Sequence, residues 1–129
     1  MDLFPAEYEL LSLFECEPTL TVPGVPWAYN CLRFDTTRGA DRVVCEIEPG
    51  DEIVRLTWEH DGSEFVRLDL NWVCGLGVES RDGCEALVGF FREAAIEPFR
   101  LQLKPRVHLR WGTAIHPSAS ANLSGRDDR

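Results

Sequence analysis

The residues most able to do chemistry in this sequence are three histidines and five cysteines, and their spacing predicts no metal site. Structural zinc sites usually bring their ligands in close pairs, and none of these residues lies two to four positions from another suitable one. The cysteines mostly share the alternating positions of aliphatic residues, which favours buried, reduced thiols over a Cys–His nucleophile pair. The residues are Cys16, Cys31, Cys45, Cys74, Cys84, His60, His108 and His116.

Other catalytic signals are equally weak. Almost any two of the 22 acidic residues could be matched as an acid–base pair, so that pattern has no specificity. The GLG triplet at Gly75 to Gly77 lies inside a strand pattern, where it predicts a bulge or close packing instead of a phosphate-binding loop. We therefore expect no catalytic residue, no metal and no cofactor, while an enzyme would require a cleft with converging titratable groups.

Alternating apolar and polar residues run through most of the chain, as in strands with one exposed face. Between residues 41 and 70 the pattern predicts three antiparallel strands, with turns at PGD and HDGS. Further strands are expected near residues 29–35, 76–79, 86–90, 99–103 and 107–111, with Ala86, Val88 and Phe90 on the core-facing side. The prediction is a mostly β (α+β) fold: an antiparallel meander of about eight strands forming a sandwich or half-open barrel, with one short N-terminal helix.

The two ends of the chain have different patterns. Residues 5–14 predict a helix with Ala6, Leu10, Leu13 and Phe14 on one face, although a shorter helix followed by a strand from Leu11 to Glu17 is an alternative. Prolines make residues 18–27 a loop or an extended crossover, and we expect Trp27 and Tyr29 at its end to pack on the core. We predict one globular domain over residues 1–112 and a disordered tail over residues 113–129.

Matching the apolar faces of the central strands predicts their register. The first hairpin takes a four-residue loop, residues 49–52, which places Arg55 opposite Glu46. The second takes the three-residue loop Asp61-Gly62-Ser63, which places Arg55 opposite Asp69. On this register, arginines of the sheet neutralise much of its own acidity.

The net charge of −9 is concentrated in the first half, where residues 1–64 hold 14 acids and 4 bases. Such a surface repels nucleic acid and anionic membranes and attracts basic proteins, although a merely solubilising surface is the alternative. A row of basic residues on the last strands would suit nucleic acid, but in an acidic protein it more often pairs with nearby acids. The N-terminus lacks the basic residues of an export signal, and no apolar run is long enough to span a membrane, so we expect a cytoplasmic protein.

In its size, acidity and strand-rich pattern with exposed acidic and aromatic residues, the chain resembles the small immunity proteins encoded beside bacterial polymorphic toxins. The resemblance supplies no diagnostic motif and assigns no residue. It implies a stoichiometric, non-catalytic antidote that neutralises a toxin, often a basic nuclease, by covering its active site.

The unpaired acids of the central strands lie at the turn tips, where we expect a basic partner to bind. A binding site for a small ligand inside the sandwich or barrel is the alternative, and it would require a sizeable apolar cavity. The candidate partner-binding residues are Glu48, Asp51, Glu52, Asp61 and Glu64.

Overall fold

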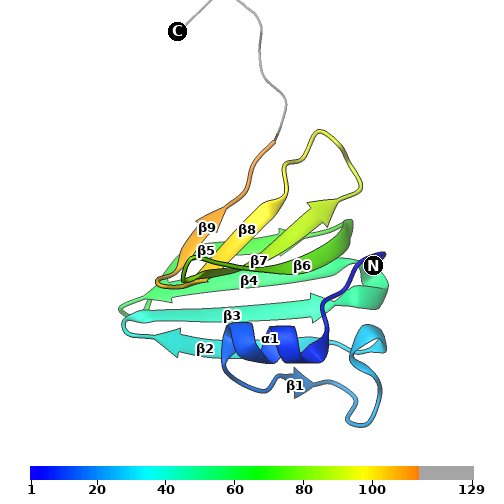
Figure 1. Cartoon of the computed structure of the whole chain (residues 1–129), viewed down its shortest axis with the longest axis horizontal. Helices are drawn as coiled ribbons and strands as arrows, with labels where there is room; N and C mark the ends of the chain where they lie inside the picture. Colours follow the sequence, from blue (N-terminus) through cyan, green and yellow to red (C-terminus); the bar gives the residue numbers. More distant parts are fainter. Residues whose placement is uncertain (114–129) are drawn as a thin grey trace, which may run out of the picture.

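The computed structural model describes residues 1–113 and shows nine strands in two antiparallel sheets, with one α-helix near the N-terminus (Figure 1). The strand order is β1-β2-β3-β4-β5 in the first sheet and β6-β7-β8-β9 in the second, so each sheet is a simple meander. The elements are α1 (Glu7–Phe14), β1 (Thr19–Leu20), η1 (Trp27–Tyr29), β2 (Leu32–Arg38), β3 (Asp41–Glu48), η2 (Pro49–Asp51), β4 (Ile53–His60), β5 (Ser63–Leu70), β6 (Val73–Arg81), β7 (Cys84–Phe91), β8 (Phe99–Lys104) and β9 (His108–Arg110).

This architecture confirms the predicted fold class, with the two-residue strand β1 added inside the predicted loop. Thr113, the last described residue, forms an isolated bridge with Ile96. The rest of the predicted tail, including His116, lies outside the described residues.

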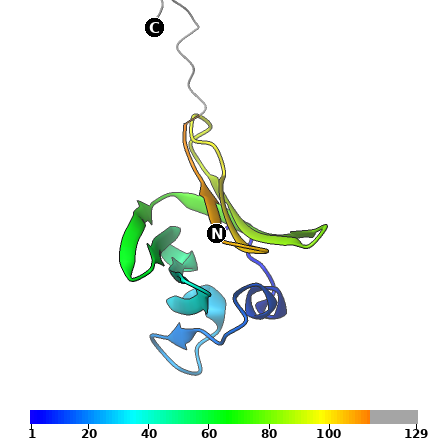
Figure 2. The ribbon, with the colours of Figure 1, turned by 90° about the vertical axis from the view of Figure 1, so that its left-hand side faces the viewer.

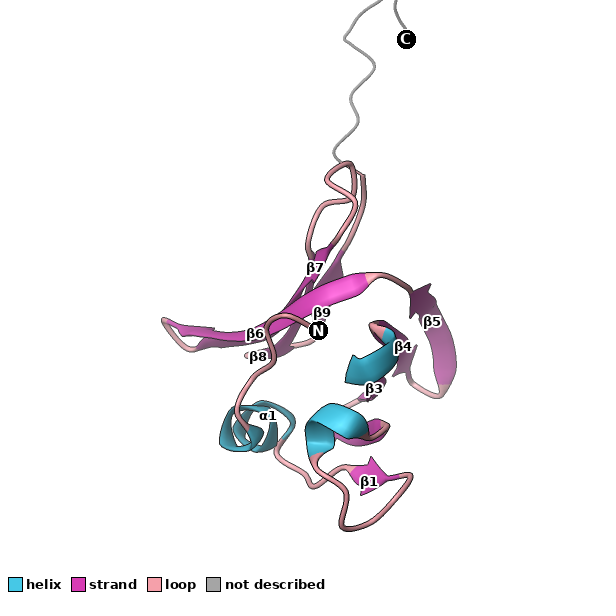
Figure 3. Cartoon of the chain, turned by 90° about the vertical axis from the view of Figure 1, so that its right-hand side faces the viewer, coloured by secondary structure: helices cyan, strands magenta, loops and turns pink. Residues whose placement is uncertain are grey.

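The two sheets form an open wedge. They meet near the β5–β6 connection and diverge away from it, and α1 lies in the angle between them (Figures 2 and 3). The helix contacts β2 of the first sheet and β6 and β7 of the second. A short helix therefore closes the side that an incomplete barrel would leave open.

The helix is set by its local sequence and by its buried face. Glu9 caps the first turn by accepting a hydrogen bond from the backbone N–H of Ala6, at 2.9 Å. The helix ends where Glu15 adopts a left-handed conformation, φ 57°. Leu10, Leu13 and Phe14 are fully buried. The helix prediction is confirmed, and the alternative strand from Leu11 is wrong, because this spacing directs three apolar side chains to one side.

Aromatic packing joins the helix to the first sheet. The rings of Phe14 and Phe34 stack with centroids 4.2 Å apart, and Trp27 meets Phe34 edge-on at 6.1 Å. Tyr29 is instead 81% exposed, so the expectation that both loop aromatics pack on the core holds for Trp27 alone.

The predicted register of the central strands is largely confirmed. Arg55 lies opposite both Glu46 and Asp69, and residues 49–52 form the first loop. The three-residue second loop is wrong: Asp61 and Gly62 alone form the turn, both at positive φ. Such a two-residue turn matches the twist of the strands, and a bulge beside Trp58 absorbs the extra residue.

The predicted orientation of β7 is also wrong. Leu87 belongs to the central core cluster, whereas Phe90 is 41% exposed. Ala86 and Val88 are buried outside that cluster. The run ALVGF has apolar residues on both faces, so its sequence could not define which face points inward.

Of the two glycines of the β6 triplet, Gly75 behaves as expected, whereas a Cβ at Gly77 would meet no atom within 4 Å. A register irregularity lies between Val73 and Gly75, and a Cβ at Gly75 would lie 3.2 Å from Cβ of Leu3. Close packing by the N-terminal segment therefore explains the first glycine of the triplet.

Candidate partner-binding surface

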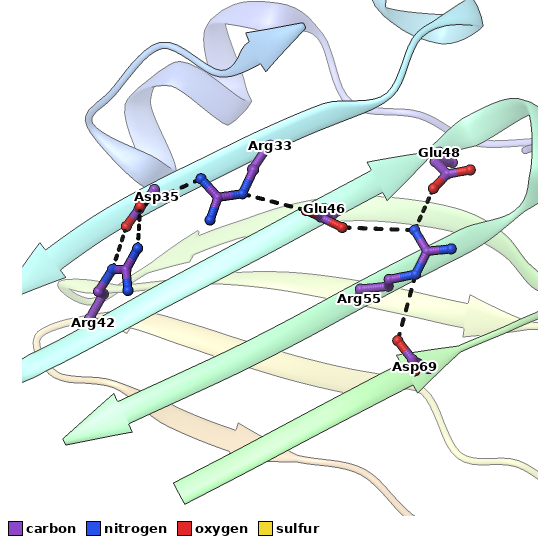
Figure 4. Close-up of polar contacts among 7 residues, drawn as sticks. All are labelled: Arg33, Asp35, Arg42, Glu46, Glu48, Arg55 and Asp69. Atoms are coloured by element: carbon purple, nitrogen blue, oxygen red, sulfur yellow. Dashed lines mark hydrogen bonds and ion pairs between the residues drawn. The ribbon is translucent and has the colours of Figure 1, made fainter. Parts of the chain in front are cut away.

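The outer face of the first sheet carries a network of arginines and carboxylates (Figure 4). Because successive side chains of a strand point to opposite faces, the polar half of each alternating pattern gathers here. Ion pairs cross from strand to strand over β2, β3, β4 and β5. The members are Arg33, Asp35, Arg42, Glu46, Glu48, Arg55, Glu59, Arg67 and Asp69.

Arg55 is the centre of one half of this network. Its guanidinium hydrogen-bonds Glu48 and lies 3.8 Å from a carboxylate oxygen of Glu46 and 3.6 Å from one of Asp69. The hydrogen bond to Glu48 is the main reason that the pKa of Arg55 is raised. One arginine thus ties together three neighbouring strands.

A second centre is the bidentate pair of Arg42 and Asp35. Nε of Arg42 lies 3.0 Å from Oδ1 of Asp35, and Nη2 lies 2.7 Å from Oδ2. These hydrogen bonds hold the pKa of Asp35 below its ordinary value. Since these side chains are about one-third exposed or more, solvent screens the pairs, and each contributes little stability. They favour the observed register more than they add to total stability.

A shallow hollow of about 250 Å³ lies within this network. Val44 and Thr57 contribute to its lining, but most of the lining side chains are charged. Such a hollow suits charged groups of a protein partner better than an apolar small molecule.

The structure separates the five predicted partner-binding acids into two groups. Glu48, Asp51 and Glu52 lie at the β3–β4 turn, and Asp61 and Glu64 lie at the β4–β5 turn, so they do not form one cluster.

Three of these five acids already have internal partners. Glu48 bonds to Arg55, Glu52 bonds to Arg92 with an Nε–Oε1 distance of 2.8 Å, and Glu64 accepts from Arg67 at 2.8 Å. Among residues 1–113, Asp51 forms no ion pair. Within the same residues, the Asp61 carboxylate has one ion-pair contact, 3.4 Å to Nε2 of His60. Asp51 and Asp61 are therefore the two candidates most available to a partner.

Sequence reasoning missed a cluster at the β4–β5 turn. Oδ1 of Asp41 accepts a hydrogen bond from the Trp58 indole at 2.9 Å and lies 2.7 Å from Nδ1 of His60. The ring of Phe65 packs against Trp58 and His60, with centroids 5.8 and 5.3 Å away. The predicted register already placed Asp41 opposite His60, so the signal was present.

Hydrogen bonding shifts the titration of this cluster. The Trp58 and His60 hydrogen bonds lower the pKa of Asp41, and the hydrogen bond to Asp41 raises the pKa of His60. The arrangement favours an ionised aspartate beside a protonated histidine.

The cysteines give no indication of reactivity. All five are free, but only Cys45 is buried, so the expectation of buried thiols is wrong for the other four. Burial raises the pKa of the Cys45 thiol, and partial burial raises that of the Cys31 thiol. A raised pKa disfavours the nucleophilic thiolate. Within residues 1–113, no three His, Cys, Asp or Glu side chains are grouped so as to hold a metal ion. Nor does that part of the chain contain a helix long and apolar enough to cross a membrane.

No protein-family model matches the sequence, and no curated protein matches it significantly. A solved structure does match the fold. A chain of a contact-dependent growth inhibition toxin–immunity protein complex from Klebsiella pneumoniae 342 aligns with a TM-score of 0.72, over 86% of this chain and 96% of that chain. The two chains share a fold. Their identity is 13%, so the comparison carries over the architecture and assigns no residue. It agrees with the resemblance to toxin-immunity proteins drawn from the sequence.

Proposed function

We propose that this chain is a non-catalytic immunity protein, which neutralises a toxin domain by binding to it and covering its active site. The observation that carries the proposal is the fold shared with a chain of a toxin–immunity complex. An antidote of this kind needs a stable surface complementary to its target and no reactive group of its own.

The charge distribution supports a basic toxin as the partner. Residues 19–70, which include the first sheet, hold ten acids and five arginines, a net of −5. Residues 73–113, which include the second sheet, hold five acids and six bases, a net of +1. A basic nuclease domain acting in the cytoplasm is the class of toxin that this asymmetry would attract, by long-range steering toward the first sheet.

We propose that Asp51 and Asp61 make the first contacts with such a partner, because they are the least neutralised of the acids at the turns. Glu48, Glu52 and Glu64 would contribute by exchanging their internal arginines for basic groups of the partner.

A small ligand held between the sheets is the second candidate function, and the packing disfavours it. Fully buried side chains from both sheets and from α1 form one continuous cluster in the interior. The hollow described above is instead open to solvent and mainly polar.

The proposal predicts that a toxin domain is encoded beside the gene for this protein, and co-expression of the two tests it. We expect growth to be rescued by this protein and a one-to-one complex to be recovered from the cells. If the toxin domain inhibits growth equally with and without this protein, and no complex forms between the purified proteins, the immunity role is rejected.

Two matched substitutions test the proposed contacts. Asp61, in a turn of the first sheet, and Asp82, in a turn of the second, both have positive φ and both precede a glycine. Asp61→Asn keeps the turn and removes one charge, so we expect it to slow association with a basic toxin by about threefold or more at low salt. Asp82→Asn removes the same charge from the other sheet and should leave association unchanged.

A further inference from the structure

The outer edge of β5 is the longest unpaired strand edge in the described part of the chain. β5 is the last strand of the first sheet and pairs only with β4 over its eight residues, Ser63–Leu70. The backbone hydrogen bonds outside the regular elements of residues 1–113 do not reach these residues either. In an antiparallel ladder alternate residues direct N–H and C=O to opposite sides, so half of the backbone groups of β5 have no strand partner.

The other sheet edges within residues 1–113 are shorter or covered. β1 has two residues and β9 has three. The thiol of Cys16 lies 3.7 Å from the Asp35 carbonyl, so residues after α1 run beside β2 beyond the end of β1. The first half of β6 hydrogen-bonds residues 2 and 3, through Cys74 and Leu76, which leaves residues 77–81. β5 is therefore the edge that could best accept another strand.

Two large exposed aromatic side chains lie at the two ends of this edge. Phe65, near the start of β5, is 60% exposed, and Trp72, just beyond its end, is 67% exposed. Asp61 and Glu64 lie near Phe65. Glu52 lies near Trp72, since its carbonyl accepts from the N–H of Val73, but its carboxylate is already paired with Arg92. An exposed edge with an aromatic side chain at each end and acids at its start is suited to a basic, partly apolar strand.

We propose that β5 is a docking edge, which accepts an extended strand of a basic protein partner as a sixth strand of the first sheet. This inference rests on the proposed binding role and adds where and how the partner binds. Main-chain hydrogen bonds along about 26 Å of strand would supply affinity, and the alternating side chains would supply specificity.

The two faces of β5 define the pattern of the partner strand. Val66, Leu68 and Leu70 are half-buried on the inner face, whereas Arg67 and Asp69 lie on the exposed outer face. The partner strand should therefore alternate apolar residues, beside Val66 and the leucines, with polar residues that include a base beside Asp69. A second copy of this chain is a poorer occupant, because two molecules of net charge −9 repel each other.

A synthetic nine-residue peptide of alternating valine and lysine, with blocked termini, serves as the probe. We expect it to slow amide exchange in β5 by about tenfold, as measured by nuclear magnetic resonance on the full chain. A peptide of alternating valine and glutamate should protect β5 less. A valine–lysine peptide with alternate backbone nitrogens methylated should give no protection, because it keeps the side chains but loses the donors.

A pair of variants tests the aromatic contact. Phe65→Ser should weaken peptide binding by about fivefold or more, since aromatic anchors are often dominant contacts at interfaces. Phe90→Ser removes an exposed phenylalanine from β7 of the other sheet and should leave binding unchanged.

Each contrary outcome identifies what fails. Equal binding of the methylated peptide, protection away from β5, or no binding by any peptide overturns docking by strand pairing. Protection of β5 that rises with protein concentration in the absence of peptide assigns the edge to a second copy and also overturns the proposal. Growth rescue in the co-expression assay decides the immunity role separately from all of these results.

Discussion

Gly89 of β7 is the position in the second sheet that is least able to accept a side chain. It lies opposite Phe99 of β8. A Cβ added to Gly89 would lie 1.8 Å from Cε2 and 2.5 Å from Cδ2 of the Phe99 ring. The ring itself is fully buried and meets Phe91 edge-on, with centroids 6.2 Å apart. Gly89→Ala therefore requires the Phe99 ring to move within a filled core.

The expected magnitude follows from two opposing effects. Overpacking a well-packed core destabilises by about 1–3 kcal/mol, and a contact this short favours the upper end of that range. Replacing glycine by alanine inside a strand stabilises the folded state by about 0.5–1 kcal/mol, because the unfolded chain loses backbone entropy. The net destabilisation of Gly89→Ala is therefore about 2 kcal/mol, which corresponds to a fall in Tm of about 8 °C for a domain of this size.

Gly77 of β6 provides the matched control, because a Cβ there meets no atom within 4 Å. Gly77→Ala should gain the entropic benefit alone and be stabilised by about 0.5 kcal/mol. Urea denaturation followed by tryptophan fluorescence, together with thermal melting, measures both variants against the parent protein.

A double variant separates the contact from a general effect of the substitution. Phe99→Leu should destabilise the parent protein but recover part of the lost stability in the Gly89→Ala background, since the smaller side chain leaves space for the new methyl group. The reasoning is refuted if Gly89→Ala is as stable as Gly77→Ala, or if the two changes at residues 89 and 99 are simply additive.

Two other predictions concern the helix and the β4–β5 turn. Phe14→Ala should destabilise the chain by about 3–5 kcal/mol in denaturant unfolding, because it leaves a cavity where the fully buried ring packs between the sheets. Tyr8→Ala, on the exposed face of the same helix, should change stability by less than about 0.5 kcal/mol. The pKa of His60 is raised by Asp41, so its contribution to stability should be fully present below a pH of about 6.5 and be lost as the pH rises through the folded-state pKa. The Tm of the parent protein should then fall more between pH 6 and 8 than that of His60→Gln, and parallel Tm curves would contradict this interpretation.

The sequence was informative about the first sheet because its strands alternate cleanly. With one polar and one apolar face, β3 and β4 have one register that buries every apolar residue and brings Arg55 beside Glu46. The same register contained the Asp41–His60 contact. By contrast, the second hairpin could not be derived in full, because a two-residue turn with a bulge and a three-residue turn give the same pairing for Arg55 and Asp69.

The sequence by itself determined an acidic, antiparallel β-meander with one short helix, since local periodicity and charge need no distant contacts to be read. Only the tertiary structure decided which face of β7 joins the central core cluster, because ALVGF is apolar on both sides and the packing of the sheets makes the choice. The tertiary structure was also needed to separate Glu52, which is bonded to the distant Arg92, from Asp51, which forms no ion pair within residues 1–113. The open edge of β5 likewise could not be predicted from the sequence. Whether a strand edge is covered depends on where the rest of the chain packs, and not on the residues of that strand.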